Sequence, residues 1–208
     1  MPAASPPTLT PRKQPRQARA MATLQTIFEA TIQVLVRDGP RRLTTTRVAE
    51  RAGVSVGSMY QYFPHKQALY YALNERYLVG LAERIEAACA ARHGAPVAQM
   101  IDALVTTYWV AKTERPEVTR ALYLSVAELD NGPLVAAFAA RADAATAAML
   151  ASAPDVSFED VPAVVLTLLS TIFGTVRSVF ERALAPDEGK AVCEQLVLMC
   201  VGYLRTAR

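Results

Sequence analysis

The chain has 208 residues, 52% of them hydrophobic, which is enough to bury one or two cores. Its net charge of +3 is unevenly divided, with +7 over residues 1–66 and −4 over the remainder, and this favours a nucleic-acid contact confined to the N-terminal end. No apolar run reads as long and charge-free enough to span a membrane, and the basic N-terminus lacks the apolar segment of a secretory signal, so we expect a cytoplasmic protein.

Residues 1–19 are expected to form a disordered basic arm, because the first 17 positions contain five prolines and few apolar residues. Two roles stay open for this arm: a solubilising tail, or a segment that contacts DNA phosphates or the minor groove. A helix is expected over about 20–38, and Gly39-Pro40 ends it.

The stretch from Thr44 to Lys66 has the pattern of two short helices joined by a tight turn. Thr44 and Ser55 suit the N-cap positions, because their hydroxyls can accept hydrogen bonds from first-turn amides. Gly53 can adopt the left-handed conformation that ends the first helix. The second helix begins with small side chains, which suits a helix that enters the DNA major groove. A plain turn between two core helices is the alternative, and the surrounding arginines argue against it.

This stretch resembles the DNA-binding domain of the TetR family of transcriptional repressors. The resemblance rests on Thr44, the turn Ala52-Gly53-Val54-Ser55, Gly57, the run Tyr60-Gln61-Tyr62-Phe63, and Lys66. It covers roughly residues 21–72. It implies a helix-turn-helix domain over 20–66, and a helical domain over 67–208 that binds an effector and dimerises.

The resemblance and the side-chain chemistry together indicate which residues contact DNA. The start of the first short helix, Tyr60 and Lys66 are expected to contact phosphates, and the start of the second helix is expected to face the bases. Val56 stands where many relatives carry lysine, which favours an apolar contact with a thymine methyl group. The expected DNA-binding residues are Thr45, Thr46, Arg47, Ser55, Val56, Gly57, Ser58, Tyr60, Gln61, Tyr62 and Lys66. His65 replaces the Asn or Ser that usually caps the next helix, and we expect a small loss of capping.

Beyond Lys66 the pattern is helical throughout, with proline and glycine separating the segments. We expect helices over about 65–92, 96–115, 116–129, 134–152, 158–184 and 187–206. No segment alternates with period two over a useful length, so no sheet is expected. The predicted fold class is therefore all-α, with about nine helices.

The last two expected helices are apolar over more than the single stripe that a surface helix needs. The resemblance implies that these helices of two subunits form a four-helix dimer interface, and a two-fold axis would match a palindromic site. The expected interface residues are Val165, Leu169, Ser170, Gly174, Leu196, Met199, Cys200 and Tyr203. The alternative is that both helices are central to a monomer core.

The resemblance also implies a small-molecule pocket framed by the helices that follow Lys66. The candidate lining residues are Met100, Leu104, Tyr108, Trp109, Tyr123, Phe138, Phe173 and Arg177. For each of them ordinary core packing is the alternative, and for Arg177 it is an ion pair with Glu181 one turn away. Tyr108 and Trp109 are adjacent, so both cannot face inward.

The expected function is a ligand-responsive repressor that binds a palindromic DNA operator as a homodimer and is released by a small, largely apolar effector. An effector-independent DNA-binding or architectural protein, or an activator, is the alternative. No enzyme, metal or cofactor is expected, because the histidines His65 and His93 have no nucleophile motif beside them. Cys89, Cys193 and Cys200 lack metal-ligand spacing, and we interpret them as small hydrophobes rather than redox sensors.

Overall fold

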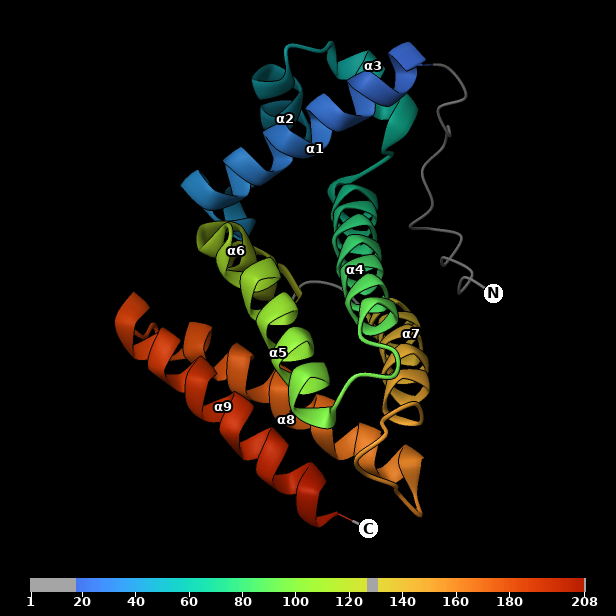
Figure 1. Ribbon diagram of the computed structural model, residues 1–208. Helices are drawn as coiled ribbons and strands as arrows, with labels where there is room; N and C mark the ends of the chain where they lie inside the picture. The colour runs from blue at the N-terminus through green and yellow to red at the C-terminus, as the bar shows by residue number, and fades with distance from the viewer. Residues whose placement is uncertain (1–17, 127–130, 208) are drawn as a thin grey trace. The chain divides into compact units, whose positions relative to one another are not determined.

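A computed structural model describes residues 18–126 and 131–207. Within these ranges there are nine α-helices, a short 3-10 helix η1 (Pro40–Arg42) and no strand, which confirms the predicted all-α class (Figure 1). The α-helices are α1 (Ala18–Asp38), α2 (Thr45–Ala52), α3 (Val56–Tyr62), α4 (Lys66–Ala91), α5 (Val97–Thr113), α6 (Pro116–Val126), α7 (Gly132–Leu150), α8 (Val161–Glu181) and α9 (Pro186–Thr206). Most of the expected arm, and the end of the helix expected over 116–129, lie outside the described residues.

The helices divide into two compact units. The N-terminal unit comprises the chain as far as Leu78 together with Glu117–Val135, and the second unit comprises Val79–Pro116 and Ala136–Arg208. The division falls inside α4, and α6 groups with the N-terminal unit. The domain boundary expected at 66/67 stays a prediction.

The N-terminal unit is built around a hydrophobic core to which α1, α2, α3 and the first turns of α4 all contribute. Ile27, Val48, Met59, Phe63 and Leu69 are each fully buried in it. Helix α1 packs on α2, and α2 packs on α3 (Figure 1). This core holds the two short helices of the helix-turn-helix on a rigid support.

The first turns of α4 are joined to this unit by two contacts between distant parts of the chain. The Tyr70 hydroxyl donates a hydrogen bond to the Pro40 carbonyl at 3.1 Å, and the Arg76 guanidinium lies 5.5 Å from the centre of the Phe28 ring. A cation over an aromatic face is attracted by the ring quadrupole. These contacts join α4 to η1 and α1.

In the second unit α5 packs against α8 and α9, which also pack against each other (Figure 1). The Arg141 guanidinium of α7 makes a bidentate pair with the Glu86 carboxylate of α4, at 2.7 and 2.6 Å. Bidentate geometry fixes the orientation of both side chains as well as their separation. The pair therefore joins α7 to the second half of α4.

A tight contact between α5 and α9 depends on the absence of a side chain at Gly189. A Cβ atom placed there would lie 3.2 Å from Cη2 of Trp109. We expect Gly189→Ala to be less stable than Gly80→Ala by about 1–3 kcal/mol, because overpacking opposes the gain in helix propensity only at Gly189. Gly80 is the matched control, since it is also helical and a Cβ added to it would meet no atom within 4 Å. Urea unfolding of both variants measures the difference, and equal free energies of unfolding would contradict the tight contact.

Two helices meet the length and composition of a membrane span, so the expectation that no run does so was wrong. They are Gly132–Leu150 and Val161–Glu181, with mean hydropathies of 1.2 and 1.8. The reason is that α7 is rich in alanine and α8 carries apolar residues on both its buried and its exposed sides. Helices of a folded core pass the same test, and α7 contains the ion-paired Arg141. Their composition is therefore weak evidence for a membrane.

Candidate nucleic-acid interface, effector residues and dimer face

The predicted caps and turn of the helix-turn-helix are confirmed. Thr44 Oγ1 accepts a hydrogen bond from the Arg47 backbone N–H at 3.2 Å, and Ser55 Oγ accepts one from the Ser58 N–H at 3.0 Å. Gly53 is left-handed, with φ 66° and ψ 28°. Only a residue without a Cβ adopts this conformation at little cost, so the angle between α2 and α3 depends on Gly53.

Helix α3 presents a row of exposed side chains with little bulk at its N-terminal end. Ser55, Val56, Gly57, Tyr60 and Gln61 are exposed, whereas Met59 faces the core. Ser58 is half-buried, and its hydroxyl lies 2.9 Å from that of Ser55. The exposed row has the slim profile that a groove-reading helix requires.

Two residues of the expected DNA-binding set lie in the core instead. Thr45 is 8% exposed, because the first residue of α2 turns inward. Tyr62 is 9% exposed, with its ring centroid 6.5 Å from that of Phe63. Both side chains are therefore buried in the described structure, and their contact with DNA stays a prediction.

The remaining expected phosphate contacts lie at the edges of this unit. Thr46 is exposed, and the half-buried Lys66 begins α4. The Arg47 guanidinium donates to the Arg42 carbonyl at 3.3 Å and lies 3.8 Å from the Asp38 carboxylate, and its side chain remains 41% exposed. These interactions hold the guanidinium of Arg47 near the N-terminus of α2.

His65 caps α4, so the expected loss of capping was wrong. Its Nδ1 atom accepts a hydrogen bond from the Ala68 backbone N–H at 3.1 Å. An imidazole nitrogen can satisfy a first-turn amide as a hydroxyl does. This hydrogen bond therefore stabilises the first turn of α4, which begins at Lys66.

Arginines gather in a surface pocket of about 410 Å³ beside α2. Its lining residues are Arg37, Asp38, Arg42, Arg47, Glu50 and Arg51. The hydrogen bond from Arg37 lowers the pKa of the Asp38 carboxyl, which keeps that group ionised. Four guanidinium groups and two carboxylates leave this surface positive, as a surface near phosphates requires.

Five of the candidate effector residues come together in the second unit. Met100, Leu104 and Tyr108 follow one another at four-residue spacing on α5 and are almost fully buried. The Phe173 ring lies 4.5 Å from that of Tyr108 and 5.4 Å from that of Phe138, measured between centroids. They form an aromatic cluster with an aliphatic stripe along α5.

The other three candidates lie elsewhere. Trp109 packs against Gly189, and Tyr123 belongs to the N-terminal unit. Arg177 has a 63% exposed side chain and donates to the Glu181 carboxylate at 2.7 Å, which is the ordinary i,i+4 pair considered as its alternative. For these three residues the expectation of an effector contact stays a prediction.

Lys112 continues the same stripe of α5 and was missed in the sequence. It is 3% exposed, and its Nζ atom lies 5.4 Å from the centre of the Tyr108 ring. Burial lowers the pKa of this ammonium group to about 8. Lys112 could have been predicted from the sequence, because it continues the four-residue spacing of Met100, Leu104 and Tyr108.

Lys112→Met is expected to remove a contribution of Lys112 to the free energy of unfolding that grows as pH rises above 8. Below pH 8 the lysine is protonated in both the folded and the unfolded chain. Between about 8 and its ordinary 10.5 the unfolded chain binds more protons, so the wild-type stability gains a contribution as pH rises. Thermal melts of both proteins between pH 7 and 10.5 measure this. A Tm difference that stays constant over the range would contradict the depressed pKa.

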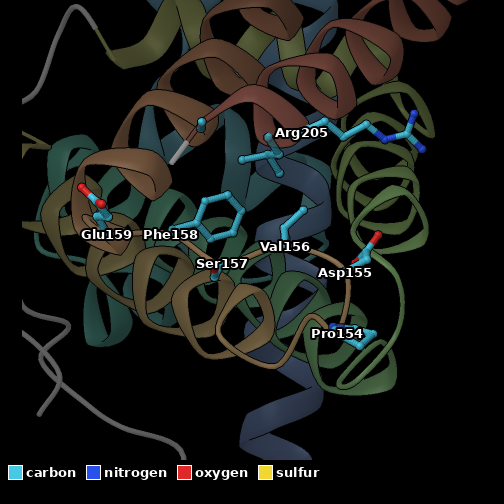
Figure 2. A pocket seen from close by; sticks show the side chains of 9 residues that line it. Pro154, Asp155, Val156, Ser157, Phe158, Glu159 and Arg205 are labelled. Carbon is cyan, nitrogen blue, oxygen red and sulfur yellow. The ribbon is translucent and has the colours of Figure 1, made fainter.

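A second pocket, of about 630 Å³, lies between the segment 154–159 and the last turn of α9. Figure 2 shows Val156 and Phe158 reaching from this segment toward the turn that carries Arg205. The Asp155 carboxylate accepts a hydrogen bond from the Val97 N–H at 2.9 Å, which ties the segment to the start of α5. No candidate effector residue lines this pocket.

The three cysteines have environments that favour the neutral thiol. Burial raises the pKa of Cys89 and Cys193, and it raises that of Cys200 to about 11. Reactive cysteines need a depressed pKa, because the thiolate is the nucleophile. The environments of Cys89 and Cys200, both buried, agree with the interpretation as small hydrophobes.

Helices α8 and α9 have exposed apolar residues, but most of these are not the residues expected at the dimer interface. Val165, Leu169, Leu196 and Cys200 are each 2% exposed and belong to the core of the unit, so they are corrected as interface residues. Leu166 and Leu198 were missed and are 64% and 65% exposed, and Met199 is 52% exposed. Ser170 and Gly174 are exposed, and Tyr203 is half-buried. We call Leu166, Ser170, Gly174, Leu198 and Met199 the α8–α9 face.

A shallow apolar pocket of about 180 Å³ adjoins this face. It is lined by Thr167, Leu168, Thr171, Met199, Cys200 and Tyr203. A run of exposed leucine and methionine beside small residues is typical of a surface that another helix covers.

Comparison with known proteins gives two family matches that together cover most of the chain. Residues 27–73 match the family described as "Bacterial regulatory proteins, tetR family", and residues 96–204 match "Tetracyclin repressor-like, C-terminal domain". The second match alone spans more than half of the chain.

Solved structures share the fold at low sequence identity. A putative TetR-family transcriptional regulator from Mesorhizobium loti MAFF303099 superposes with a TM-score of 0.72 at 16% identity, covering 89% of this chain and 98% of that one. The fatty acid degradation regulator FadR from Bacillus halodurans gives 0.69 at 16% identity, covering 93% and 98%.

The nucleoid occlusion factor SlmA from Actinobacillus pleuropneumoniae serotype 5b (strain L20) is 36% identical over 99 residues. That match covers 47% of this chain and 48% of the relative, so the chain matches about half the length of this curated protein.

Proposed function

The chain belongs to the TetR family of bacterial transcriptional regulators, and from this premise we propose that it is a ligand-responsive repressor. It binds a palindromic operator as a homodimer and is released by a small effector. The observation that carries the proposal is the exposed, slim N-terminal end of α3, held by caps at Thr44 and Ser55.

In this proposal α3 enters the major groove and the surrounding residues bind the backbone. Ser55, Val56, Gly57, Ser58 and Gln61 face base edges. Thr46, Arg47, Tyr60 and Lys66 contact phosphates on either side. Phosphate contacts fix the register of a reading helix, and base contacts supply its specificity.

The α8–α9 face supports the homodimer. Its exposed leucines are costly in water, and the small side chains at Ser170 and Gly174 let a second helix approach closely. In a homodimer the two copies of α3 would read half-sites about one helical turn apart, roughly 34–36 Å.

Coupling between effector and DNA runs through α4, which extends unbroken from Lys66 to Ala91 and contributes residues to both compact units. An effector shifts the equilibrium only by its different affinities for the DNA-competent and released states, commonly by about 1–3 kcal/mol.

The second candidate is a DNA-binding protein without a small-molecule effector, with a role in nucleoid occlusion. The 36% identity with the nucleoid occlusion factor supports it. This candidate predicts protected sites dispersed over the genome and no compound that releases the protein from DNA. The repressor predicts few sites, close to regulated genes.

Footprinting of the purified chain on the DNA flanking its own gene tests the proposal. The expected result is a protected palindrome whose occupancy falls steeply with salt. Absence of salt-sensitive binding to any duplex would overturn both candidates.

A further inference from the structure

The surface pocket beside α2 holds more positive charge than the proposed function uses. We call it the arginine pocket. It has a volume of about 410 Å³ and is lined by Arg37, Asp38, Arg42, Arg47, Glu50 and Arg51. These residues come from the end of α1, from η1 and from α2, all within the N-terminal unit. Four guanidinium groups against two carboxylates give this lining a formal charge of +2. Of the four arginines, only Arg47 has a role in the proposed function.

Two guanidinium groups of the pocket are oriented by neutral acceptors. Nε of Arg51 donates a hydrogen bond to Oε1 of Gln33 at 2.6 Å, and Nη1 of Arg47 donates to the Arg42 carbonyl at 3.3 Å. The guanidinium of Arg42 is exposed and has no hydrogen bond or ion pair with any described residue. A guanidinium carries several N–H donors in a fixed fork, so all three arginines keep donors for a further acceptor.

The two carboxylates differ in how they act on an anion. Asp38 accepts two hydrogen bonds from Arg37, both at 2.9 Å, and lies 3.8 Å from Arg47. Its charge is therefore already compensated by two guanidinium groups. Glu50 is exposed and forms no ion pair within the described part of the chain. Glu50 is therefore the group of this lining that would repel an anion most strongly.

We propose that the arginine pocket is a binding site for a phosphate group. Arg42, Arg47 and Arg51 donate hydrogen bonds to the phosphate oxygens, and Glu50 limits the affinity by repulsion. Arginine suits this role, because its planar fork bonds two phosphate oxygens at once and is less strongly hydrated than an ammonium group. Gln33 and Asp38 act as positioning residues, since each contacts a guanidinium of the pocket.

Two sources supply such a group with the same chemistry at the pocket. One is the DNA backbone, because Arg47 lines the pocket and contacts a phosphate in the proposed function. This source rests on the proposed function and adds backbone contacts at Arg42 and Arg51. The other source is a free phosphate compound, which would compete with DNA for Arg47 and does not depend on the proposed function.

Arg42→Ala and Arg51→Ala test the site, and Arg120→Ala is the matched control. Arg120 is an exposed arginine of the same unit, on α6, and it is not among the lining residues. All three variants lose one positive charge, so a general effect of net charge is equal in them. Arg51→Ala also loses the hydrogen bond to Gln33, whereas Arg42→Ala loses no side-chain contact with a described residue. Arg42→Ala therefore keeps the test valid if Arg51→Ala is unstable.

The first measurement is calorimetric titration of the full chain with inorganic phosphate, at an ionic strength held constant with sodium chloride. The wild type should bind phosphate. Arg42→Ala and Arg51→Ala should weaken this binding at least tenfold, and Arg120→Ala should change it less than twofold. Glu50→Gln should strengthen it at least twofold, because a repelling charge is removed that salt screens only in part.

The second measurement is the salt dependence of duplex DNA binding by the same variants. Arg42→Ala and Arg51→Ala should each lower the slope of log K against log salt by about 1.8 for a dimer, and Arg120→Ala should leave it unchanged. An effect on the DNA slope alone identifies the backbone as the source, and an effect on phosphate binding alone identifies a free compound.

The proposed site is overturned if Arg42→Ala and Arg51→Ala behave like Arg120→Ala in both measurements. Phosphate binding that all three variants weaken equally would also overturn it, since the anion would then respond to net charge alone. A wild type that binds phosphate in the pocket but binds no duplex refutes the proposed function and leaves the phosphate site standing.

Discussion

Leu198→Asp is expected to convert the proposed dimer into a folded monomer of 22.5 kDa. Leu198 is 65% exposed on α9, so the substitution leaves the core of the unit intact. In a dimer formed through the α8–α9 face the same carboxylate would be buried against apolar side chains without a partner, which is strongly unfavourable. Light scattering after size exclusion measures the mass, and we expect affinity for a palindromic duplex to fall at least a hundredfold.

Two variants separate this effect from general damage. Val110→Asp introduces the same charge at a 49% exposed site on α5, and it should leave the dimer intact. Leu196→Asp buries the charge at a 2% exposed site, two residues from Leu198, and should unfold the chain. If Leu198→Asp remained dimeric while Val110→Asp did not, the interface would involve α5 instead.

The sequence predicted the helix-turn-helix in detail because its determinants are local. A cap hydroxyl needs only the amides of the next turn, and a left-handed Gly53 needs only its own backbone, so both could be recognised from residue types and spacing. The helix ends differ from expectation by a few residues, as fraying termini usually do. His65 shows the limit of this approach, since its capping role depends on which nitrogen of the ring faces Ala68.

The second unit was harder to predict because exposure there depends on tertiary packing. Helix α8 is apolar on several sides, and the sequence does not say which side α5 and α9 cover. Val165 and Leu166 are adjacent and similarly hydrophobic, yet the first is 2% exposed and the second 64%.

Lys66→Ala is expected to weaken binding to every duplex by a similar factor and to reduce its salt dependence. Each phosphate contact made by a lysine releases counterions, and losing one per subunit should lower the slope of log K against log salt by about 1.8 for a dimer. Tyr60→Phe removes a neutral hydroxyl at a 43% exposed position, so affinity should fall while the slope is unchanged. Fluorescence anisotropy between 50 and 300 mM salt (roughly the range in which such slopes are linear) measures both quantities.

Val56→Ala tests a contact with a base, in contrast to the phosphate contacts expected of Lys66 and Tyr60. Val56 is 38% exposed on the row of α3 that would face the bases. Two kinds of duplex are compared, one with thymine and one with another base at the contacted position. Truncating Val56 should reduce the difference between their binding free energies by about 1 kcal/mol and leave the salt slope unchanged. The duplexes are drawn from a random pool selected by the wild-type protein. If Lys66→Ala altered the preferred sequence and Val56→Ala altered only the salt slope, the assignment of α3 to the bases and of Lys66 to the backbone would be reversed.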